Sequence, residues 1–177
     1  LIIVAFVFNF MFAKVYGGIV EAFSLPDFFD ISWFRNGSSA MAAMIIAYMW
    51  HGTGFYMVIY IAGLQMIHKE HLEAAEIDGA SSFQKLFRVI IPLTMPSITI
   101  NLFLSLTNAF KAFEMPFQMT SGGPGKATEV LALNIYREAF VRSRMGLGSA
   151  KAVLMFLLVV AVTIIQLKIT KSREVDL

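Results

Sequence analysis

Long runs of uncharged residues alternate with short charged segments along this chain. Neither lysine, arginine, aspartate nor glutamate occurs from Asn36 to His68, from Val89 to Phe110, or from Ala152 to Leu167. A helix needs about 20 mainly apolar residues to cross the hydrocarbon layer of a membrane. The first two runs are long enough, and the third becomes so when Lys151 extends its ammonium from the helix end towards water. We therefore predict spans at about residues 38–64, 91–110 and 147–169.

The first residues, LIIVAFVFNFMFA, have the composition of a fourth span but are too short to cross alone. We predict that residues 1–13 are the end of a partial span. Because the chain begins with Leu1 rather than methionine, we also expect the domain to lack its N-terminal spans. A cleaved signal peptide is the alternative, but the sequence shows neither a basic first region nor a small-residue cleavage site.

The segments between the predicted spans differ in character. A mixed loop is expected at about residues 14–35. Gly52 and Gly54 are expected to loosen or kink the span at residues 38–64. Residues 111–148 contain the turn-forming sequence TSGGPGKAT and a short helical pattern in TEVLALNIYREAF. These patterns predict an all-α membrane protein, a polytopic bundle of transmembrane helices forming one domain over residues 1–177.

The charged segment at residues 65–90 carries the signals of two short helices. EHLEAAEID is rich in strong helix formers, and Gly79 is suited to end that helix. Ser81 and Gln84 have the spacing of a capping box that starts a second helix. Two prolines then mark the turn into the third span, which leaves the first helix exposed at the membrane surface. The second helix carries an apolar stripe at positions i, i+3, i+4 and i+7, namely Phe83, Leu86, Phe87 and Ile90.

The composition supports a membrane protein and excludes several other classes. Hydrophobic residues make up 58% of the 177 residues and charged ones 15%, against about 45–50% and about 25% in soluble domains. The absence of cysteine excludes disulfides and thiolate metal sites, and a net charge of +2 is too small to indicate nucleic-acid binding. His68, His71 and Glu73 do not have the spacing of a metal site, so we predict solvated side chains there and no metal.

The sequence EAAEIDGASSFQKLFRVIIPL, residues 73–93, resembles the EAA loop of ABC-importer permeases. That pattern has EAA, a glycine after three further residues, and a later proline-containing ending, which here is IIPL. AEIDGAS is similar to the carbohydrate-uptake subgroup. FQMTSGGPGKATEVLALNIYREAF and GLGSAKAVLMFLLVV resemble segments that maltose- and glycerol-phosphate-type permeases carry after the loop. The resemblance covers the chain from about residue 38 onward and is weaker over residues 1–37.

The resemblance implies the type I ABC-importer permease fold and a role for residues 65–90, which we therefore call the coupling loop. In this family the loop docks on a separate cytoplasmic ATPase, and the motif falls here on Glu73, Ala74, Ala75, Asp78 and Gly79. The resemblance also implies a multi-pass protein of the cytoplasmic (inner) membrane of a prokaryote. It implies no catalysis and no cofactor in this chain, because the partner ATPase uses the ATP.

Other partners and an orientation follow from the same resemblance. The partners implied are a second permease subunit, an extracytoplasmic solute-binding protein, a sugar substrate and the lipid membrane, with no nucleic acid. Residues 111–148 would lie on the outer side and contact the binding protein, so we call them the outer segment. The positive-inside rule does not support this orientation. The inner side holds six cations (Lys69, Lys85, Arg88, Lys168, Lys171 and Arg173) and the outer side eight (Lys14, Arg35, Lys111, Lys126, Arg137, Arg142, Arg144 and Lys151).

Polar positions within two predicted spans are candidates for a substrate path. His51 lies in a charge-free span with Tyr48 and Gly52 beside it, and ionisable residues at such places usually face an interior or a cavity. A packed histidine and hydrogen bonds between helices are the alternatives, and both interpretations stay open. On the span predicted at residues 91–110, a narrow stripe of small, mainly polar residues has helical spacing. The resemblance adds to these candidates an alanine, which has no side-chain hydrogen-bonding group. These residues are Asn101, Ser105, Asn108 and Ala112, with Ala109.

The predicted function is that of a permease subunit of an ATP-driven importer for a sugar or oligosaccharide. Import of glycerol-phosphate or another polyol derivative by the same family is the nearest alternative. An ion-coupled carrier is the alternative from another class, but it would place acidic residues within the membrane, and the two clearest spans have none. SGGPGKAT is not a phosphate-binding loop, because Thr120 and Ala127 stand where glycine and Ser/Thr are required.

Overall fold

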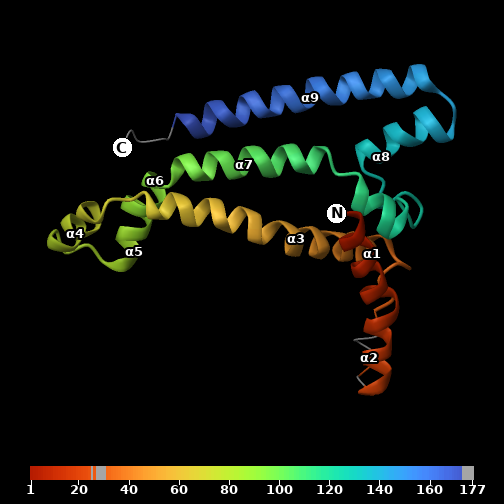
Figure 1. The fold of residues 1–177 in the computed structure, drawn as a ribbon, viewed down its shortest axis with the longest axis horizontal. Coiled ribbons are helices and arrows are strands. Elements are labelled where there is room, and N and C mark those ends of the chain that lie inside the picture. The colour runs from red at the N-terminus through yellow and green to blue at the C-terminus, as the bar shows by residue number, and fades with distance from the viewer. Residues whose placement is uncertain (25, 27–30, 173–177) are drawn as a thin grey trace. The chain divides into compact units, whose positions relative to one another are not determined.

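The computed structural model describes residues 1–24, 26 and 31–172, and every regular element in these residues is helical (Figure 1). The all-α prediction is therefore confirmed. In the described residues, five-residue π-helical turns continue α-helices at Met11–Val15, Leu86–Ile90 and Arg137–Val141, and another stands apart at Pro116–Thr120. The α-helices are α1 (Ile2–Phe10), α2 (Tyr16–Ala22), α3 (Gly37–Gln65), α4 (Lys69–Ile77), α5 (Ser82–Lys85), α6 (Ile91–Leu93), α7 (Met95–Phe110), α8 (Leu131–Tyr136) and α9 (Met145–Lys171).

Within the described residues, three helices are long and apolar enough to cross a membrane. They are Ile2–Ala22, which joins α1 and α2, Gly37–Gln65 and Met145–Lys171. The pair Ser82–Leu93 and Met95–Phe110 passes the same test together, although it is bent by 66° at a short break. Many large apolar side chains on these helices are exposed, as expected where lipid or another chain covers the surface.

The mixed loop expected from residue 14 was wrong at its beginning, because residues 14–22 are helical. The helix continues through exposed Lys14, and the apolar pattern resumes after it, with Val20 buried. The glycine pair between them does not interrupt the helix. Residues 25 and 27–30 of that expected loop, and Arg173 of the charge count, lie outside the described residues.

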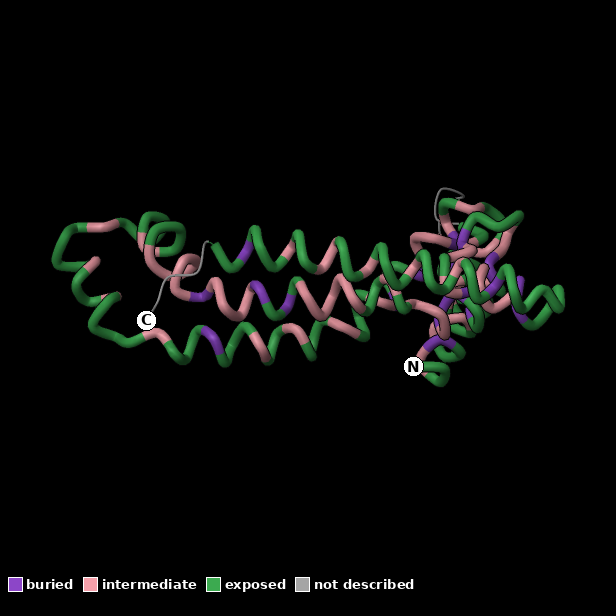
Figure 2. Tube along the Cα trace, turned by 90° about the horizontal axis from the view of Figure 1, so that it is seen from above, coloured by how far each residue is buried: buried purple, intermediate pink, exposed green. Residues whose placement is uncertain are grey.

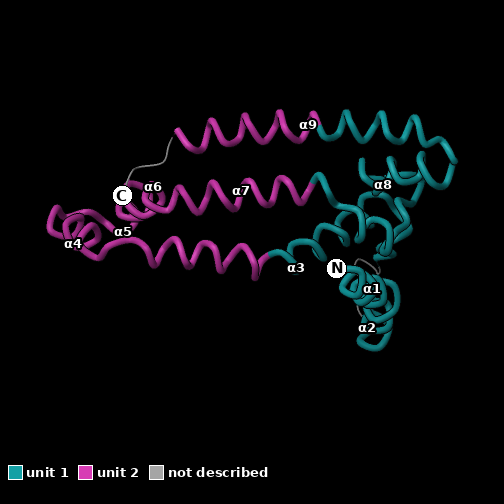
Figure 3. Tube along the Cα trace, turned by 45° about the horizontal axis from the view of Figure 1, so that its top comes forward, with its two compact units in different colours: residues 1–52, 110–156 teal, residues 53–109, 157–177 magenta. Residues whose placement is uncertain are grey.

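The chain divides into two compact units (Figure 3). Unit 1 comprises residues 1–52 and 110–156, and unit 2 comprises residues 53–109 and 157–177. The divisions fall inside α3 and α9, so each of these helices contributes to both units. α3 continues as one helix through Gly52 and Gly54.

Unit 1 has a small core of alanine and methionine. Its buried residues are shown in purple in Figure 2, and aromatic side chains, among them Phe8, Phe12 and Trp33, pack around them. The Phe12 and Trp33 ring centroids are 4.7 Å apart. Alanine on one helix lets another approach closely, and methionine fills the irregular space that remains. The core residues are Ala5, Ala43, Met44, Ala47, Met115 and Met119.

Unit 2 is a set of long helices with the coupling loop at one end. Figures 1 and 3 show α7 lying between the later parts of α3 and α9, with α4 and α5 beyond their ends. Thr99 and Asn101 of α7 are buried in this arrangement. The fold therefore places the short charged helices where they connect α3 to α7.

Candidate functional site

The coupling loop ends its first helix with a Schellman arrangement. Gly79 has a φ of +74°, and its N–H donates to the Glu76 carbonyl at 3.0 Å, while the Ala80 N–H donates to the Ala75 carbonyl at 3.0 Å. These two bonds satisfy carbonyls that α4 would otherwise leave unpaired. A Cβ at Gly79 would meet nothing within 4 Å. Glycine is therefore needed here for its left-handed backbone rather than for space.

The second helix of the coupling loop begins with the predicted capping box. The Gln84 N–H donates to Ser81 Oγ at 3.3 Å, and the Ser81 N–H donates to Gln84 Oε1 at 2.8 Å. Lys85 Nζ reaches back to Glu76 Oε1 at 2.6 Å and joins this helix to α4. The hydrogen bond and the charge of Lys85 lower the pKa of Glu76. Because the Glu76 side chain is 62% exposed, water screens the pair and its contribution to stability is small.

The predicted coupling residues lie together on α4 and at its C-terminal end. Glu73, Ala74, Asp78 and Gly79 are exposed, and Ala75 is half-buried. Sequence reasoning missed Ile77, which is 86% exposed. A single exposed apolar side chain is ordinary on a protein surface, but Ile77 lies one helical turn from the exposed Ala74 of the EAA motif. The signal was available, because Ile77 lies two residues after the EAA motif, between the charged residues Glu76 and Asp78.

The predicted apolar stripe of the second helix is also exposed. Phe83 is 71% and Phe87 52% exposed, and their ring centroids are 4.5 Å apart. The chain then bends at Thr94, whose Oγ1 donates to the Ile90 carbonyl at 2.6 Å. Pro96 has no N–H to donate to the carbonyl four residues earlier, which explains the bend at this place. The prolines thus turn the chain from the coupling loop into α7.

The first group of substrate-path candidates belongs to unit 1. Tyr48 packs against the core of that unit, and its hydroxyl is buried without a hydrogen-bond partner of ordinary geometry. His51 is exposed, whereas Gly52 and Ala112 are half-buried. An unpaired buried hydroxyl is costly, so Tyr48 is the polar group of this set that gains most from a further partner.

The second group lies on α7 in unit 2, so the structure describes the candidates as two separate groups. Asn101 is 3% exposed and its Nδ2 donates to the Tyr56 carbonyl on α3 at 3.2 Å. Asn108 Nδ2 donates to the Tyr56 hydroxyl at 3.4 Å. Ser105 donates to its own helix, at Leu102 O, and Ala109 is exposed. Both asparagines thus make the contacts between helices that were the alternative interpretation, and sequence reasoning missed their partner Tyr56.

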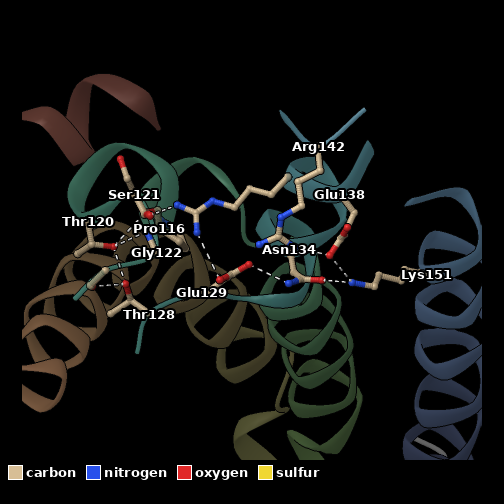
Figure 4. Close-up of polar contacts among 12 residues, drawn as sticks. Pro116, Thr120, Ser121, Gly122, Thr128, Glu129, Asn134, Glu138, Arg142 and Lys151 are labelled. Carbon is tan, nitrogen blue, oxygen red and sulfur yellow. Dashed lines mark hydrogen bonds and ion pairs between the residues drawn. The ribbon is translucent and has the colours of Figure 1, made fainter. Parts of the chain in front are cut away.

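The outer segment contains a network of charged and amide side chains that sequence reasoning did not find (Figure 4). Glu129, with a side chain 4% exposed, accepts from Asn134 Nδ2 at 2.8 Å and from Arg137 Nη1 at 3.3 Å. Arg137 also donates to the carbonyl of Ser121. Lys151, at the start of α9, donates to Asn134 Oδ1 at 2.7 Å. The network therefore joins the turn, α8 and α9 within unit 1.

Glu138 is the second acid of this network. Its side chain is 7% exposed and pairs with Arg142 and, at 3.3 Å, with Lys151 Nζ. Burial alone would raise the pKa of Glu138, but the hydrogen bonds and charges of Lys151 and Arg142 outweigh it and lower the pKa. The i, i+4 spacing of Glu138 and Arg142 was the signal from which this pair could have been predicted.

Threonine side chains close the turn that carries SGGPGKAT. Thr120 and Thr128 hydroxyls lie 2.6 Å apart, and Thr128 Oγ1 donates to the Gly123 carbonyl at 2.7 Å. The predicted turn and the predicted short helix after it are both present, the latter as α8 and its π-helical continuation. Within the described residues no group of three or more His, Cys, Asp or Glu side chains is arranged to hold a metal ion.

Comparison with known proteins assigns a family. The sequence profile described as "Binding-protein-dependent transport system inner membrane component" matches residues 1–174. The chain is 37% identical over 176 residues to the probable starch degradation products transport system permease protein AmyD of Thermoanaerobacterium thermosulfurigenes, which covers 99% of this chain and 60% of that protein. It is 34% identical over 149 residues to the sn-glycerol-3-phosphate transport system permease protein UgpA of Brucella abortus, which covers 81% of this chain and 50% of that protein.

A solved structure is similar in fold. It is a bacterial alginate ABC transporter in complex with an alginate pentasaccharide-bound periplasmic protein, with a TM-score of 0.82 and 18% identity over 97% of this chain and 60% of that chain. The chain thus spans between 50% and 60% of the length of these proteins. Because the family profile matches nearly every residue, we conclude that this chain belongs to the binding-protein-dependent transport system inner membrane components, the multi-pass permeases of ABC importers.

Proposed function

We propose that this chain is part of the permease subunit of an ATP-driven importer that moves a sugar or oligosaccharide across the cytoplasmic membrane. The observation that carries the proposal is the construction of the coupling loop. α4 is exposed, closed by the Schellman bonds at Gly79 and followed by a capping box, so its shape exists before any partner binds. It follows α3, which is long and apolar enough to cross a membrane, and precedes the bent pair Ser82–Leu93 and Met95–Phe110, which passes the same test together. A separate ATPase that docks on α4 would supply the energy, and this chain would catalyse no reaction.

The other partners are assigned to other parts of the chain. The outer segment is the proposed contact for the extracytoplasmic solute-binding protein. Its network of charged and amide side chains gives the surface around α8 a defined shape. The similar alginate transporter was solved with a periplasmic protein bound, which supports a partner of that kind. A second permease subunit would cover part of the exposed apolar surface of the spanning helices.

A sugar is preferred to glycerol-phosphate as the cargo. The relatives named above are described for starch degradation products and for sn-glycerol-3-phosphate, so the family accommodates both classes. Proteins usually bind a phosphate through arginine or lysine. The polar candidates for the substrate path carry hydroxyl, amide and imidazole groups, and none of them is an arginine or lysine. They are Tyr48, His51, Asn101, Ser105 and Asn108. These groups suit the hydroxyls of a neutral sugar.

The test is co-purification of the full-length protein with its ATPase from detergent extracts. We expect the ATPase to accompany the wild type and to be lost in Gly79→Trp and Glu73→Lys. Gly125→Trp is the matched control, because Gly125 also has a positive φ and open space around it but lies in the outer segment. Membrane levels of all four proteins are measured alongside, so that loss of binding is distinguished from loss of the protein.

Uptake into proteoliposomes then identifies the cargo. Wild-type assemblies with the partner permease and the binding protein are offered labelled maltotriose, glucose or glycerol 3-phosphate, with ATP inside. Uptake that needs ATP and resists a protonophore supports the importer, and the accepted compound decides between the two cargo classes. If no ATPase associates and a protonophore abolishes uptake, the ion-coupled carrier replaces the proposal.

A further inference from the structure

α3 and α7 approach each other closely beside the coupling loop, at Gly63 and Ser97. Gly63 is buried, and a Cβ built on it would lie 2.7 Å from Ser97 Cβ and still closer to Ser97 Oγ. Real Cβ atoms essentially never show contacts under 3.0 Å. Rotation of the serine side chain would move Oγ away but not Cβ. The two helix backbones can therefore keep this distance only while residue 63 has no side chain.

The same contact includes the bend at the start of α7. Thr94, which is 5% exposed, places its Cγ2 3.4 Å from the hypothetical Gly63 Cβ. Thr94 lies one turn before Ser97, at the break between the coupling loop and α7. Gly63 lies near the end of α3, where its carbonyl accepts from the Met66 N–H at 3.3 Å. The end of α3 therefore packs against the start of α7 at Gly63, Thr94 and Ser97.

Further along, hydrogen bonds hold the three long helices of unit 2. Asn101 and Asn108 bond to Tyr56 between α7 and α3, as described above. On another side of α7, Gln166 Nε2 of α9 donates to the Thr99 carbonyl at 3.4 Å and contacts Thr170 Oγ1 at 3.2 Å. Polar contacts of this kind between helices restrict sliding of one helix along another.

From these contacts we infer that Gly63 and Ser97 are positioning residues for energy coupling. Their contact makes the end of α3, the coupling loop and the start of α7 move as one body. A displacement of α4 by the ATPase is then delivered to two spanning helices together, rather than absorbed by sliding between them. The inference rests on the proposed function and deepens it, because it names the contact through which the coupling loop acts. A coupling element of this kind needs packed interfaces that shift as units.

The experiment uses the complete transporter in proteoliposomes with the cargo that the wild type accepts from the maltotriose, glucose and glycerol 3-phosphate panel. Gly63→Ala is compared with Gly54→Ala, which lies on the same helix with nothing within 4 Å of its Cβ position. Ser97→Gly alone, and Gly63→Ala combined with Ser97→Gly, complete the set. The double variant removes both serine atoms that would lie closer than 3.0 Å, whereas Thr94 Cγ2 at 3.4 Å is an ordinary contact. Transport, ATP hydrolysis, ATPase co-purification and thermal stability are measured for each.

We expect Gly63→Ala to lower transport roughly tenfold while ATP hydrolysis stays within about twofold of wild type, as for a loss of coupling free energy. ATPase co-purification should be unchanged, because α4 is not altered. The double variant should recover most of the transport, and Gly54→Ala should match wild type. A merely structural contact would lower transport and hydrolysis in proportion, which overturns the inference. Wild-type transport by Gly63→Ala, or a double variant as defective as the single one, also overturns it.

Failure of the proposed function gives a different result. If the wild-type assembly binds no ATPase and hydrolyses no ATP, the proposed function fails and this inference fails with it. If the wild type transports with ATP and Gly63→Ala does the same, the proposed function stands and the inference alone is wrong. The wild-type measurement therefore separates the two.

Discussion

The coupling loop and the outer segment both connect spanning helices, but they are held in opposite ways. The coupling loop uses local devices, namely the bonds around Gly79, a capping box and one exposed ion pair between Lys85 and Glu76. The outer segment uses contacts between residues distant along the chain, such as those of Arg137 with Ser121 and of Lys151 with Asn134. The two acids of its network, Glu129 and Glu138, have buried side chains.

Backbone conformations show the same contrast. In the coupling loop the described residue with a positive φ is Gly79, which adopts it without steric cost. In the outer segment Ser121 and Lys126 have φ values of 48° and 77°, which cost a residue with a Cβ about 1–2 kcal/mol each. Such conformations persist when their surroundings fix them, and Ser121 is fixed by the hydrogen bond from Arg137 to its carbonyl.

The two segments therefore differ in what fixes their shape: bonds between near neighbours in the coupling loop, and contacts between distant residues in the outer segment. The coupling loop carries its shape in its own sequence, so it can move as a unit and still offer the same helix to a partner. The outer segment depends on a charge network, so we expect it to be destabilised if one member of the network is removed. Changes of sequence or solution conditions should therefore affect the two segments unequally.

The largest effect is expected when an acid of the outer network is removed. Glu129→Ala removes the buried carboxylate that accepts from both Arg137 and Asn134, which should destabilise unit 1 by about 3 kcal/mol. The measurement is thermal unfolding in detergent, together with proteolysis of the outer segment. Glu76→Ala is the matched change in the coupling loop and should leave the melting temperature within error, because that pair is exposed. Equal losses in both variants would contradict the contrast.

The sequence predicted the coupling loop well because its signals are local. The glycine after α4, the Ser81 and Gln84 spacing, and the prolines on either side of the bend at Thr94 each act within a few residues, and each feature is present in the structure. The all-helical fold also followed from the long apolar runs. The start of the expected loop at residue 14 failed, because the apolar pattern resumes after Lys14 and helix formation depends on that pattern more than on one charge.

The outer network and the packing of α3 on α7 could not be predicted in the same way. Lys151 lies 17 residues from Asn134, and Asn101 lies 45 residues from Tyr56, so no local spacing reveals these pairs. Gly63 resembles the other glycines of α3 in sequence, and its close approach to Ser97 appears only when the helices are packed. The substrate-path residues remain a prediction, since they fall in two separately described units.

A second, smaller effect compares one glycine from each segment. Gly79 and Gly125 both have a positive φ and open space around the Cβ position. Alanine at either position should cost about 1–2 kcal/mol through its left-handed backbone. We expect similar losses of thermal stability, but weakened ATPase co-purification in Gly79→Ala alone. Weakened co-purification in both variants would show that general destabilisation, and not the shape of α4, controls the association.

The smallest effect is expected from acid, which tests the two lowered pKa values against each other. The pKa of Glu138, although burial opposes the lowering, lies below its ordinary value of 4.5 because of Lys151 and Arg142. Its ion pairs therefore stabilise the outer segment above pH 4.5, and this stability is lost as the pH falls through the lower folded value. The pKa of Glu76 is lowered too, but its exposed pair with Lys85 contributes little stability that acid can remove.

Hydrogen exchange measured at pH values above and below 4.5 tests this difference. After correction for the intrinsic rate, exchange at the lower pH should be faster in α8 and almost unchanged in α4. Glu138→Gln should abolish the acid-dependent part of the change in α8. An acid-dependent change confined to α4 would contradict the comparison, because it would mean that the exposed pair stabilises its segment more than the buried network does.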